Sequence, residues 1–155
     1  MKIFIIRLML VLFLSAALGS GLVSANNNRV ILKTDVVETL LVPKSTESLS
    51  WERVSPNSLA MPKKIERNGA KGCAIFSFNI NEQGATTDIK TEAVVPSFGL
   101  RRLAKEYLES WQWEAKPSGG IEESVLLRLD FCIGGATNQE AQDICEHQAS
   151  LPCTR

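Results

Sequence analysis

The clearest pattern in the sequence is an alternation of apolar and polar residues from Cys73 to Ile80. One face of this segment is apolar throughout and carries Ala74, Phe76, Phe78 and Ile80. A period of two that includes aromatic residues is typical of a half-buried β-strand. Asn81 to Gly84 follows as a turn, in which Gly84 can take the positive φ of a short hairpin loop. Residues 85–95, rich in Thr and Val, are then expected to form the returning strand.

After Pro96 the period changes to that of a helix. Ser97 is a candidate N-cap for a helix of about fifteen residues. One stripe of the helix is apolar and places Trp111 in the core: Leu100, Leu103, Ala104, Tyr107, Leu108 and Trp111. A helix of this kind packs on a sheet. A third strand is expected at 122–133, with one apolar face made of Val125, Leu127, Leu129 and Phe131.

These elements predict an α+β fold, a three-stranded antiparallel sheet with one main helix on one face. The order is strand, strand, helix, strand. Because a helical crossover joins parallel strands, the first strand is expected between the other two and antiparallel to both. This arrangement brings Cys73, at the start of the first strand, close to Cys132, at the end of the third, on the same face of the sheet.

The N-terminal segment has the features of a secretory signal. Lys2 and Arg7 are followed by an apolar run at 8–18, and Val23-Ser24-Ala25 offers small residues for cleavage after Ala25. The alternative is an uncleaved membrane anchor. The apolar run of about eleven residues is shorter than the roughly 20 that span a bilayer, so cleavage and export are expected.

The four cysteines lie after this segment, and an even number in an exported chain predicts two disulfides. Strand geometry favours the pairs Cys73–Cys132 and Cys145–Cys153, while the other two connectivities stay open. A zinc site built from Cys145, His147 and Cys153 is the alternative use of these residues. Since the sequence lacks the close C-x-x-C pair of most zinc sites, no metal is expected.

Charge and motifs exclude several classes of function. The chain carries 17 basic and 17 acidic residues, and no Lys/Arg block stands out, so neither nucleic acid nor an anionic membrane is expected as a partner. The single histidine, His147, lies in no recognisable nucleophile motif, and no Gly-rich phosphate loop is present. We therefore expect neither an enzyme nor a cofactor.

Several short motifs, in order, resemble the C-terminal domain of TonB. They are Met61-Pro62-x-x-Ile65, Gly72 before the alternating strand, the turn that ends at Gly84, Trp111-Gln112-Trp113 before Pro117, and Phe131 with Gly134-Gly135 beyond it. The resemblance covers about residues 55–138. TonB itself has a membrane anchor and a long Pro-rich linker, whereas residues 26–60 here contain only Pro43 and Pro56. The chain thus looks like a free-standing C-terminal domain.

Together with the N-terminal signal and the cysteines, the resemblance divides the chain into four regions. They are a signal peptide (1–25), an N-terminal arm (26–55), a TonB C-terminal-like domain (56–138) and a tail pinned by a disulfide (139–155). It also implies a protein of the periplasm, connected with TonB-dependent transport across the outer membrane.

The function implied by the resemblance is binding of an extended peptide along the last strand. The expected partner is a peptide of an outer-membrane receptor or of another envelope protein. The residues expected to line this edge are Glu122, Ser124, Leu126, Arg128 and Asp130, with Arg128 suited to an acidic partner residue. Strand edges could also pair two copies into a dimer. The alternative is an edge already covered by residues 26–60 or by the tail, in a structural or assembly protein of the envelope.

Overall fold

The computed structural model describes residues 31–42, 49–56, 59–117 and 119–154. The predicted signal peptide, residues 1–25, lies outside these ranges. The elements, in chain order, are β1 (Thr34–Val42), β2 (Trp51–Ser55), α1 (Lys63–Arg67), β3 (Gly72–Ile80), β4 (Thr86–Val95), α2 (Leu100–Glu109), β5 (Gln112–Ala115), β6 (Glu123–Ile133) and α3 (Asn138–Ser150). The fold class is α+β, as predicted. In the described ranges, no helix is both long and apolar enough to cross a membrane.

The predicted hairpin is confirmed as β3 and β4. The turn between them is closed by Asn81, whose side chain accepts hydrogen bonds from the backbone N–H groups of Gln83 and Ala85. Gly84 takes the expected positive φ, at 73°, and a side chain there would collide with the backbone oxygen of Trp113. Glycine is therefore required both by the turn and by the approach of β5.

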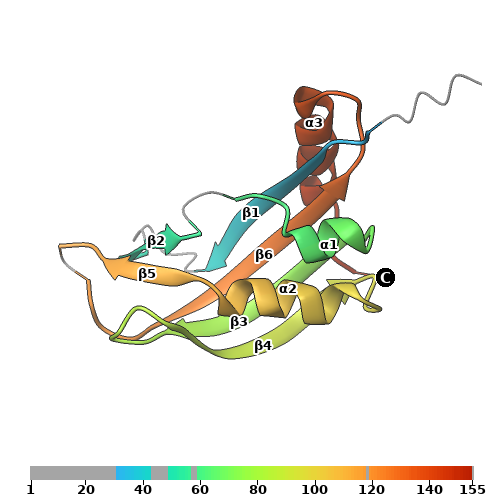
Figure 1. The fold of residues 1–155 in the computed structure, drawn as a ribbon. Coiled ribbons are helices and arrows are strands. Elements are labelled where there is room, and N and C mark those ends of the chain that lie inside the picture. The colour runs from blue at the N-terminus through green and yellow to red at the C-terminus, as the bar shows by residue number, and fades with distance from the viewer. Residues whose placement is uncertain (1–30, 43–48, 57–58, 118, 155) are drawn as a thin grey trace, which may run out of the picture.

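The main sheet has four strands in the order β1-β6-β3-β4, rather than the predicted three (Figure 1). The predicted part is confirmed, since β3 lies between β4 and β6 and is antiparallel to both. The additional strand, β1, comes from the predicted N-terminal arm and pairs antiparallel with β6 from Thr34 to Val42. The arm also supplies β2, which pairs with β5 in a separate two-stranded ribbon.

The core lies between the sheet and α2. The alternating faces are those expected from the sequence: Ala74, Phe76, Phe78 and Ile80 of β3 and Val125, Leu127, Leu129 and Phe131 of β6 are buried. Trp111 is fully buried, which confirms its place in the core. The helix is ten residues long, because the chain turns at Ser110 and continues as β5. Its N-cap residue is Gly99, so the prediction of Ser97 at this position is wrong.

The opposite face of the sheet is partly covered by α3, which contacts β1 and β6. Thr137 caps this helix, because its hydroxyl accepts a hydrogen bond from the N–H of Glu140 at 3.2 Å. The helix differs from the tail expected at residues 139–155. The sequence does not indicate this helix, because its buried residues, Ala141 and Cys145, form no continuous apolar stripe.

Two disulfides are present, as predicted, but their pairing is Cys73–Cys153 and Cys132–Cys145. The expected pairs were wrong, although the strand order and the face of both strand cysteines were right. The register places Cys73 opposite Asp130, so Cys132 lies two residues farther along β6. Both cysteines instead face α3 and the residues after it, which supply the bonding partners.

Candidate functional site

The residues predicted to form a binding edge lie in the interior of the sheet. Strand β6 is paired with β1 on one side and with β3 on the other. The prediction that β6 has an exposed edge is therefore wrong over the stretch where β1 covers it, from Leu126 to Ile133. The covering strand comes from residues 26–60, which is the alternative left open by the sequence. Glu122 immediately precedes the strand and Ser124 lies at its uncovered start, and both hydrogen-bond to the side chain of Asn79.

Arg128 and Asp130 form a buried ion pair instead of facing a partner. The guanidinium donates to both carboxylate oxygens, at 2.7 Å from Nε and 2.9 Å from Nη2. Asp130 is fully buried and Arg128 is only 8% exposed. Two parallel hydrogen bonds give this pair a fixed geometry, which suits a structural role.

The same arginine holds the C-terminal end of α3. Its Nη1 donates to the backbone oxygen of Leu151 at 2.6 Å, and its Nη2 donates to that of Gln148 at 3.0 Å. The last carbonyl groups of a helix lack partners within the helix and carry partial negative charge, so a cation stabilises them. The Gln148 side chain in turn donates to Asp130 and to the backbone oxygen of Gly72, both at 3.0 Å. Arg128 is thus occupied within the molecule by contacts that the predicted role toward an acidic partner did not include.

The outer strands of the sheet are β1 and β4, and they differ in their surroundings. Arg53 of β2 forms an ion pair with Glu38 of β1 at 2.7 Å, and α3 also contacts β1. In the described ranges, β4 pairs with β3 and with no other strand. Likewise β1 pairs with β6 and with no other described strand, so both outer strands have one unpaired edge. They differ in that the edge of β4 runs beside hollows of the surface.

The edge of β4 is irregular. The pairing with β3 shifts register twice, between Ile75 and Phe76 and between Ser77 and Asn79, and Asp88 has a φ of 52°. Bulges and charged residues on an edge strand oppose indiscriminate pairing with other sheets. A polypeptide that binds here would pair over short stretches, so side chains must supply much of the selectivity.

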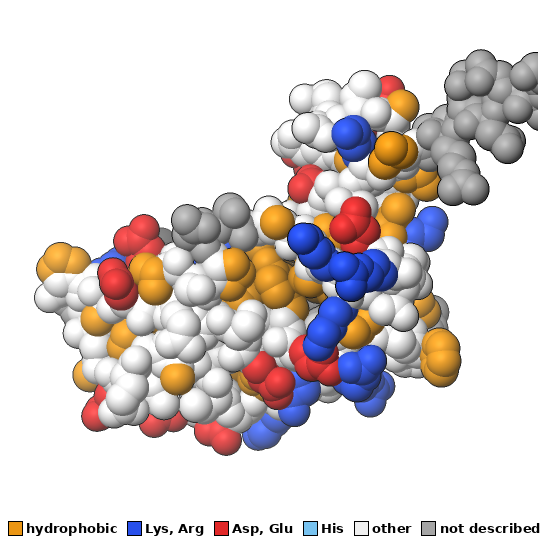
Figure 2. Space-filling model, viewed as in Figure 1, with side chains coloured by type: hydrophobic (Ala, Val, Ile, Leu, Met, Phe, Trp, Pro, Cys, Tyr) orange, Lys and Arg blue, Asp and Glu red, His pale blue; other side chains and the backbone are white. Residues whose placement is uncertain are grey.

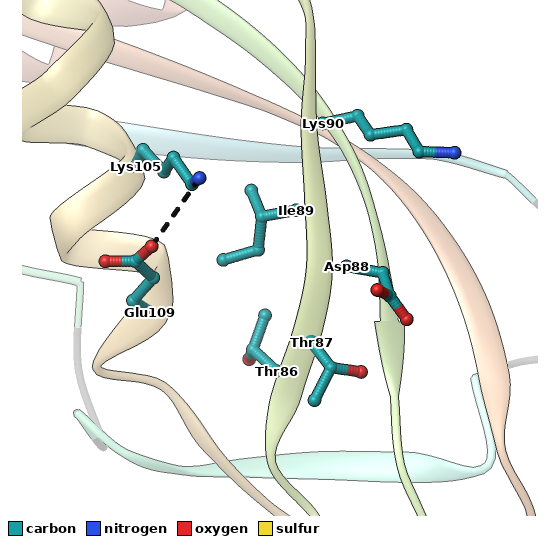
Figure 3. A pocket seen from close by; sticks show the side chains of 7 residues that line it. All are labelled: Thr86, Thr87, Asp88, Ile89, Lys90, Lys105 and Glu109. Carbon is teal, nitrogen blue, oxygen red and sulfur yellow. Dashed lines mark ion pairs between the residues drawn. The ribbon is translucent and has the colours of Figure 1, made fainter.

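A shallow hollow of about 420 Å³ follows the outer edge of β4. Ile89 points from β4 toward α2, where Lys105 and Glu109 form an ion pair at 3.7 Å (Figure 3). Lys90 and Asp88 point to the other side of the strand in the same view. Because residues from both faces of β4 line this hollow, it lies along the edge and is open to an added strand.

A second hollow of about 770 Å³ adjoins the first, and Lys105 lines both. It lies beside the start of α2 and is lined by Asn68, Thr91, Ser97, Phe98, Gly99, Arg101, Arg102 and Lys105. Phe98 is 95% exposed. We call the two hollows together the edge groove. It combines an unpaired strand with an exposed aromatic ring and several cations.

The basic residues of the groove are part of a larger basic face. Figure 2 shows Lys and Arg side chains gathered over α1 and α2. These two helices contain six basic residues, against three acidic ones: Lys63, Lys64, Arg67, Arg101, Arg102 and Lys105. The sequence does not show this face as a block, because the packing of α1 against α2 brings the two groups together.

Hydrogen bonds on this face involve Glu106 in particular. Lys64 donates to its carboxylate at 3.0 Å, and Arg102 forms an ion pair with it as well. The hydrogen bonds from Lys64 and Arg102 hold the pKa of Glu106 below its usual value. This acidic side chain is therefore engaged by two cations. Arg101, by contrast, forms no ion pair with a carboxylate of the described residues.

A polar cluster behind α2 faces the interior rather than the groove. The guanidinium of Arg53 lies 4.2 Å from the ring centre of Trp111, and the rings of Trp111 and Tyr107 meet edge to face. Burial raises the pKa of Tyr107 above its ordinary value. Arg53 also pairs with Glu38, so this cluster ties β1 and β2 to α2.

The cysteines and the histidine form no metal site in the structure. All four cysteines are in disulfides, so none is available as a thiolate ligand. No group of three or more possible ligands comes together among the described residues. Two of the three ligands of the zinc alternative, Cys145 and Cys153, are therefore held in disulfides.

Neither a protein-family model nor a curated protein matches the sequence of this chain. The resemblance to the TonB C-terminal domain therefore rests on the motifs of the sequence.

Proposed function

We propose that this protein is a non-catalytic module of the periplasm that binds an extended segment of another envelope protein. The observation that carries the proposal is the edge groove, in which the outer strand β4 runs beside the hollow that contains Phe98. An unpaired edge offers backbone N–H and C=O groups to a strand of a partner, and pockets beside it select side chains. The binding edge is thus placed on β4 instead of β6.

A binding role without catalysis is supported by the state of the reactive side chains. The four cysteines are oxidised, which removes them as nucleophiles. His147 is exposed on α3, on the side of the sheet away from α2. The groove itself is lined by Thr, Lys, Arg and Glu side chains, which suit recognition of a polypeptide.

The proposed partner is the N-terminal peptide of an outer-membrane receptor or a segment of another envelope protein. This link to TonB-dependent transport is supported by the order β3, β4, α2 and β6, which follows the strand–strand–helix–strand order of the resemblance. The position beside β6, where that family is expected to pair with its peptide, is taken here by β1. A peptide would have to displace β1 or use one of the two outer strands, and the hollows beside β4 favour that strand.

A structural or assembly role in the envelope is the second candidate. The bulges of β4 and the cover that β1 provides for β6 favour it, because both features oppose the addition of a strand. A dimer paired through the β4 edges would belong to this class. The two candidates differ in whether the groove binds a separate peptide.

The experiment is an NMR titration of the exported, oxidised protein with N-terminal peptides from outer-membrane receptors of the same cell. We expect amide shifts to concentrate in β4 and α2. The variant Thr91→Pro should weaken binding, since proline blocks an added strand, whereas Thr39→Pro on β1 is the matched control on the opposite outer strand. Circular dichroism verifies that each variant is folded.

Two outcomes would contradict the proposal. Shifts confined to β1 and β6 would return the binding edge to the last strand, with β1 displaced. The absence of shifts with every peptide, at concentrations that detect millimolar dissociation constants, would favour the structural role.

A further inference from the structure

The edge groove is charged unevenly along its length. Arg101 and Arg102 line the end near Phe98, Lys105 lies in the middle, and Glu109 lies at the end near Thr86. A segment bound in the groove would therefore meet positive charge at one end and mixed charge at the other. The chain as a whole is balanced, with 17 basic and 17 acidic residues, so this positive charge is local.

Two of these cations have unused capacity for a carboxylate. Arg101 is exposed and makes no hydrogen bond or ion pair with any residue in the described ranges. Lys105 has a long contact of 3.7 Å with Glu109, and both side chains are about half exposed. Arg102, by contrast, is paired with Glu106. The available charge therefore lies at Arg101 and Lys105, on the side of α2 that lines the groove.

Phe98 supplies an apolar contact at the same end. At 95% exposure, almost the whole ring is in contact with water. Exposed aromatic residues that become buried on association often contribute a large share of the binding free energy. Asn68 and Thr91 line the same hollow and can hydrogen-bond to the backbone or side chains of a bound segment.

Resting on the proposed function, we infer that the groove binds an acidic segment of the partner protein. Its carboxylates lie beside Arg101 and Lys105, and one apolar side chain lies against Phe98. The concave shape of the hollow favours a polypeptide over the flat surface of a bilayer. The charge complementarity sets the partner class, and the pattern of cations sets the end of the groove that receives the carboxylates.

The test uses three fluorescent peptides of equal length that differ in charge. The first has Asp and Glu around a single Leu, the second has Asn and Gln at the same positions, and the third has Lys. The exported protein, with its disulfides intact, is titrated with each and followed by fluorescence anisotropy, and amide shifts locate the site. We expect the acidic peptide to bind most tightly, and its affinity to fall as salt rises, because salt screens exposed charges.

Matched variants locate the charge and the apolar contact. Arg101→Glu should weaken binding of the acidic peptide about 10-fold, since it replaces an attraction by a repulsion at an exposed site. Lys33→Glu is the control, because Lys33 is also an exposed basic residue but lies just before β1 and lines neither hollow of the groove. Phe98→Ser should weaken binding about 10-fold. Ile121→Ser, at another exposed apolar residue, should leave it unchanged.

The possible failures are distinguishable. If all three peptides bind in the groove equally, or if Arg101→Glu binds like the parent, the inference is wrong and the proposed function stands. If no peptide perturbs β4 or α2, both are wrong. Binding to vesicles of phosphatidylglycerol and phosphatidylethanolamine that depends on Phe98, without binding of peptides, would overturn the inference in favour of a membrane surface.

Discussion

Helices α2 and α3 pack on opposite faces of the same sheet, yet different interactions hold them there. Four residues of α2 are buried in the core: Leu100, Leu103, Ala104 and Leu108. In α3 the buried residues are Ala141 and Cys145, and the helix region is fixed by two disulfides and by the contacts of Arg128. Their charges differ as well, since α3 contains three acidic residues and no Lys or Arg, whereas α2 contains three basic residues.

The comparison shows two ways to cover a sheet. Burial of apolar side chains contributes about 1.5–3 kcal/mol for each large residue, so α2 needs no covalent attachment. The interface of α3 contains a buried ion pair, for which desolvation offsets much of the attraction. The two disulfides therefore supply the attachment of α3 to the sheet that apolar contacts alone do not provide. The outer side of α2 is not required to hold the helix, which leaves it available to the proposed partner.

The largest expected loss of stability comes from removing the disulfides that attach α3 and the residues after it to the sheet. Replacing the Cys73–Cys153 bond by two alanines should lower the free energy of unfolding by about 4.5 kcal/mol, and replacing Cys132–Cys145 by about 3 kcal/mol. The reason is the sequence separation, 80 residues for the first bond and 13 for the second, because a longer closed loop restricts the unfolded chain more. Urea denaturation measures both values. Equal losses, or a larger loss for the shorter loop, would show that local packing of α3 outweighs chain closure.

Asp130→Ala should lower the free energy of unfolding by about 4 kcal/mol, because it leaves the guanidinium of Arg128 buried without its counter-charge. The double variant Arg128→Met/Asp130→Leu removes both charges, so its free energy of unfolding should fall by less, about 1–2 kcal/mol. This remaining loss comes from the missing hydrogen bonds between Arg128 and the end of α3. Chemical denaturation gives both values. A double variant as unstable as the single one would contradict the assignment of the cost to an unpaired charge.

On the α2 side, apolar truncation should dominate. Leu108→Ala should lower the free energy of unfolding by about 3 kcal/mol, because the fully buried side chain leaves a cavity. Ile144→Ala is the counterpart on α3, where the side chain is 41% exposed, and it should lose less than about 1 kcal/mol. Thermal denaturation ranks the two variants. Similar losses would mean that α3 is also held by apolar packing, which would remove the contrast between the helices.

The smallest effect concerns Glu106 on the exposed side of α2. The pKa of Glu106 is lowered in the folded protein, so its carboxylate stabilises the fold. This stabilisation is fully present above the unfolded pKa of about 4.3 and is lost as the pH falls through the folded pKa. Glu106→Gln should therefore be slightly less stable than the parent at neutral pH and equal to it at low pH. Melting temperatures between neutral and acidic pH test this. A difference that stays constant across the range would exclude the ion pairs with Lys64 and Arg102 as its cause.

The sequence allowed more to be predicted on the α2 side than on the α3 side. The stripe from Leu100 to Leu108 and the alternation in β3 and β6 are repeated local signals, so the elements and their buried faces were predicted. In α3 the spacing of apolar residues is weak, and no such signal was present. The apolar segment from Val36 to Val42 was visible, but its pairing with β6 depends on residues far away in the sequence.

The candidate site also combines a feature that the sequence indicated with features that depend on residues far apart in the chain. The sequence indicated that a strand edge could bind a peptide, but it placed that edge on β6, where β1 pairs in the structure. Phe98 was not recognised at all, because one aromatic residue in a loop has no pattern around it. The basic face was missed because Lys63 to Arg67 and Arg101 to Lys105 are separate in the sequence and meet only when α1 packs on α2.

The sequence by itself determined the hairpin, the amphipathic helix, the last strand and the face that each turns to the core. These properties depend on periodicities of two and of 3.6 residues, which are local to each element. Tertiary structure decided the pairing of the cysteines, the strand beside β6, and the two strands that form the edges of the sheet. Each of these depends on which distant cysteine or strand becomes a neighbour. The register of the strands and the packing of α3 determine those neighbours. The even number of cysteines predicts two bonds, but it is the position of Cys73 opposite Asp130, two residues from Cys132, that assigns them.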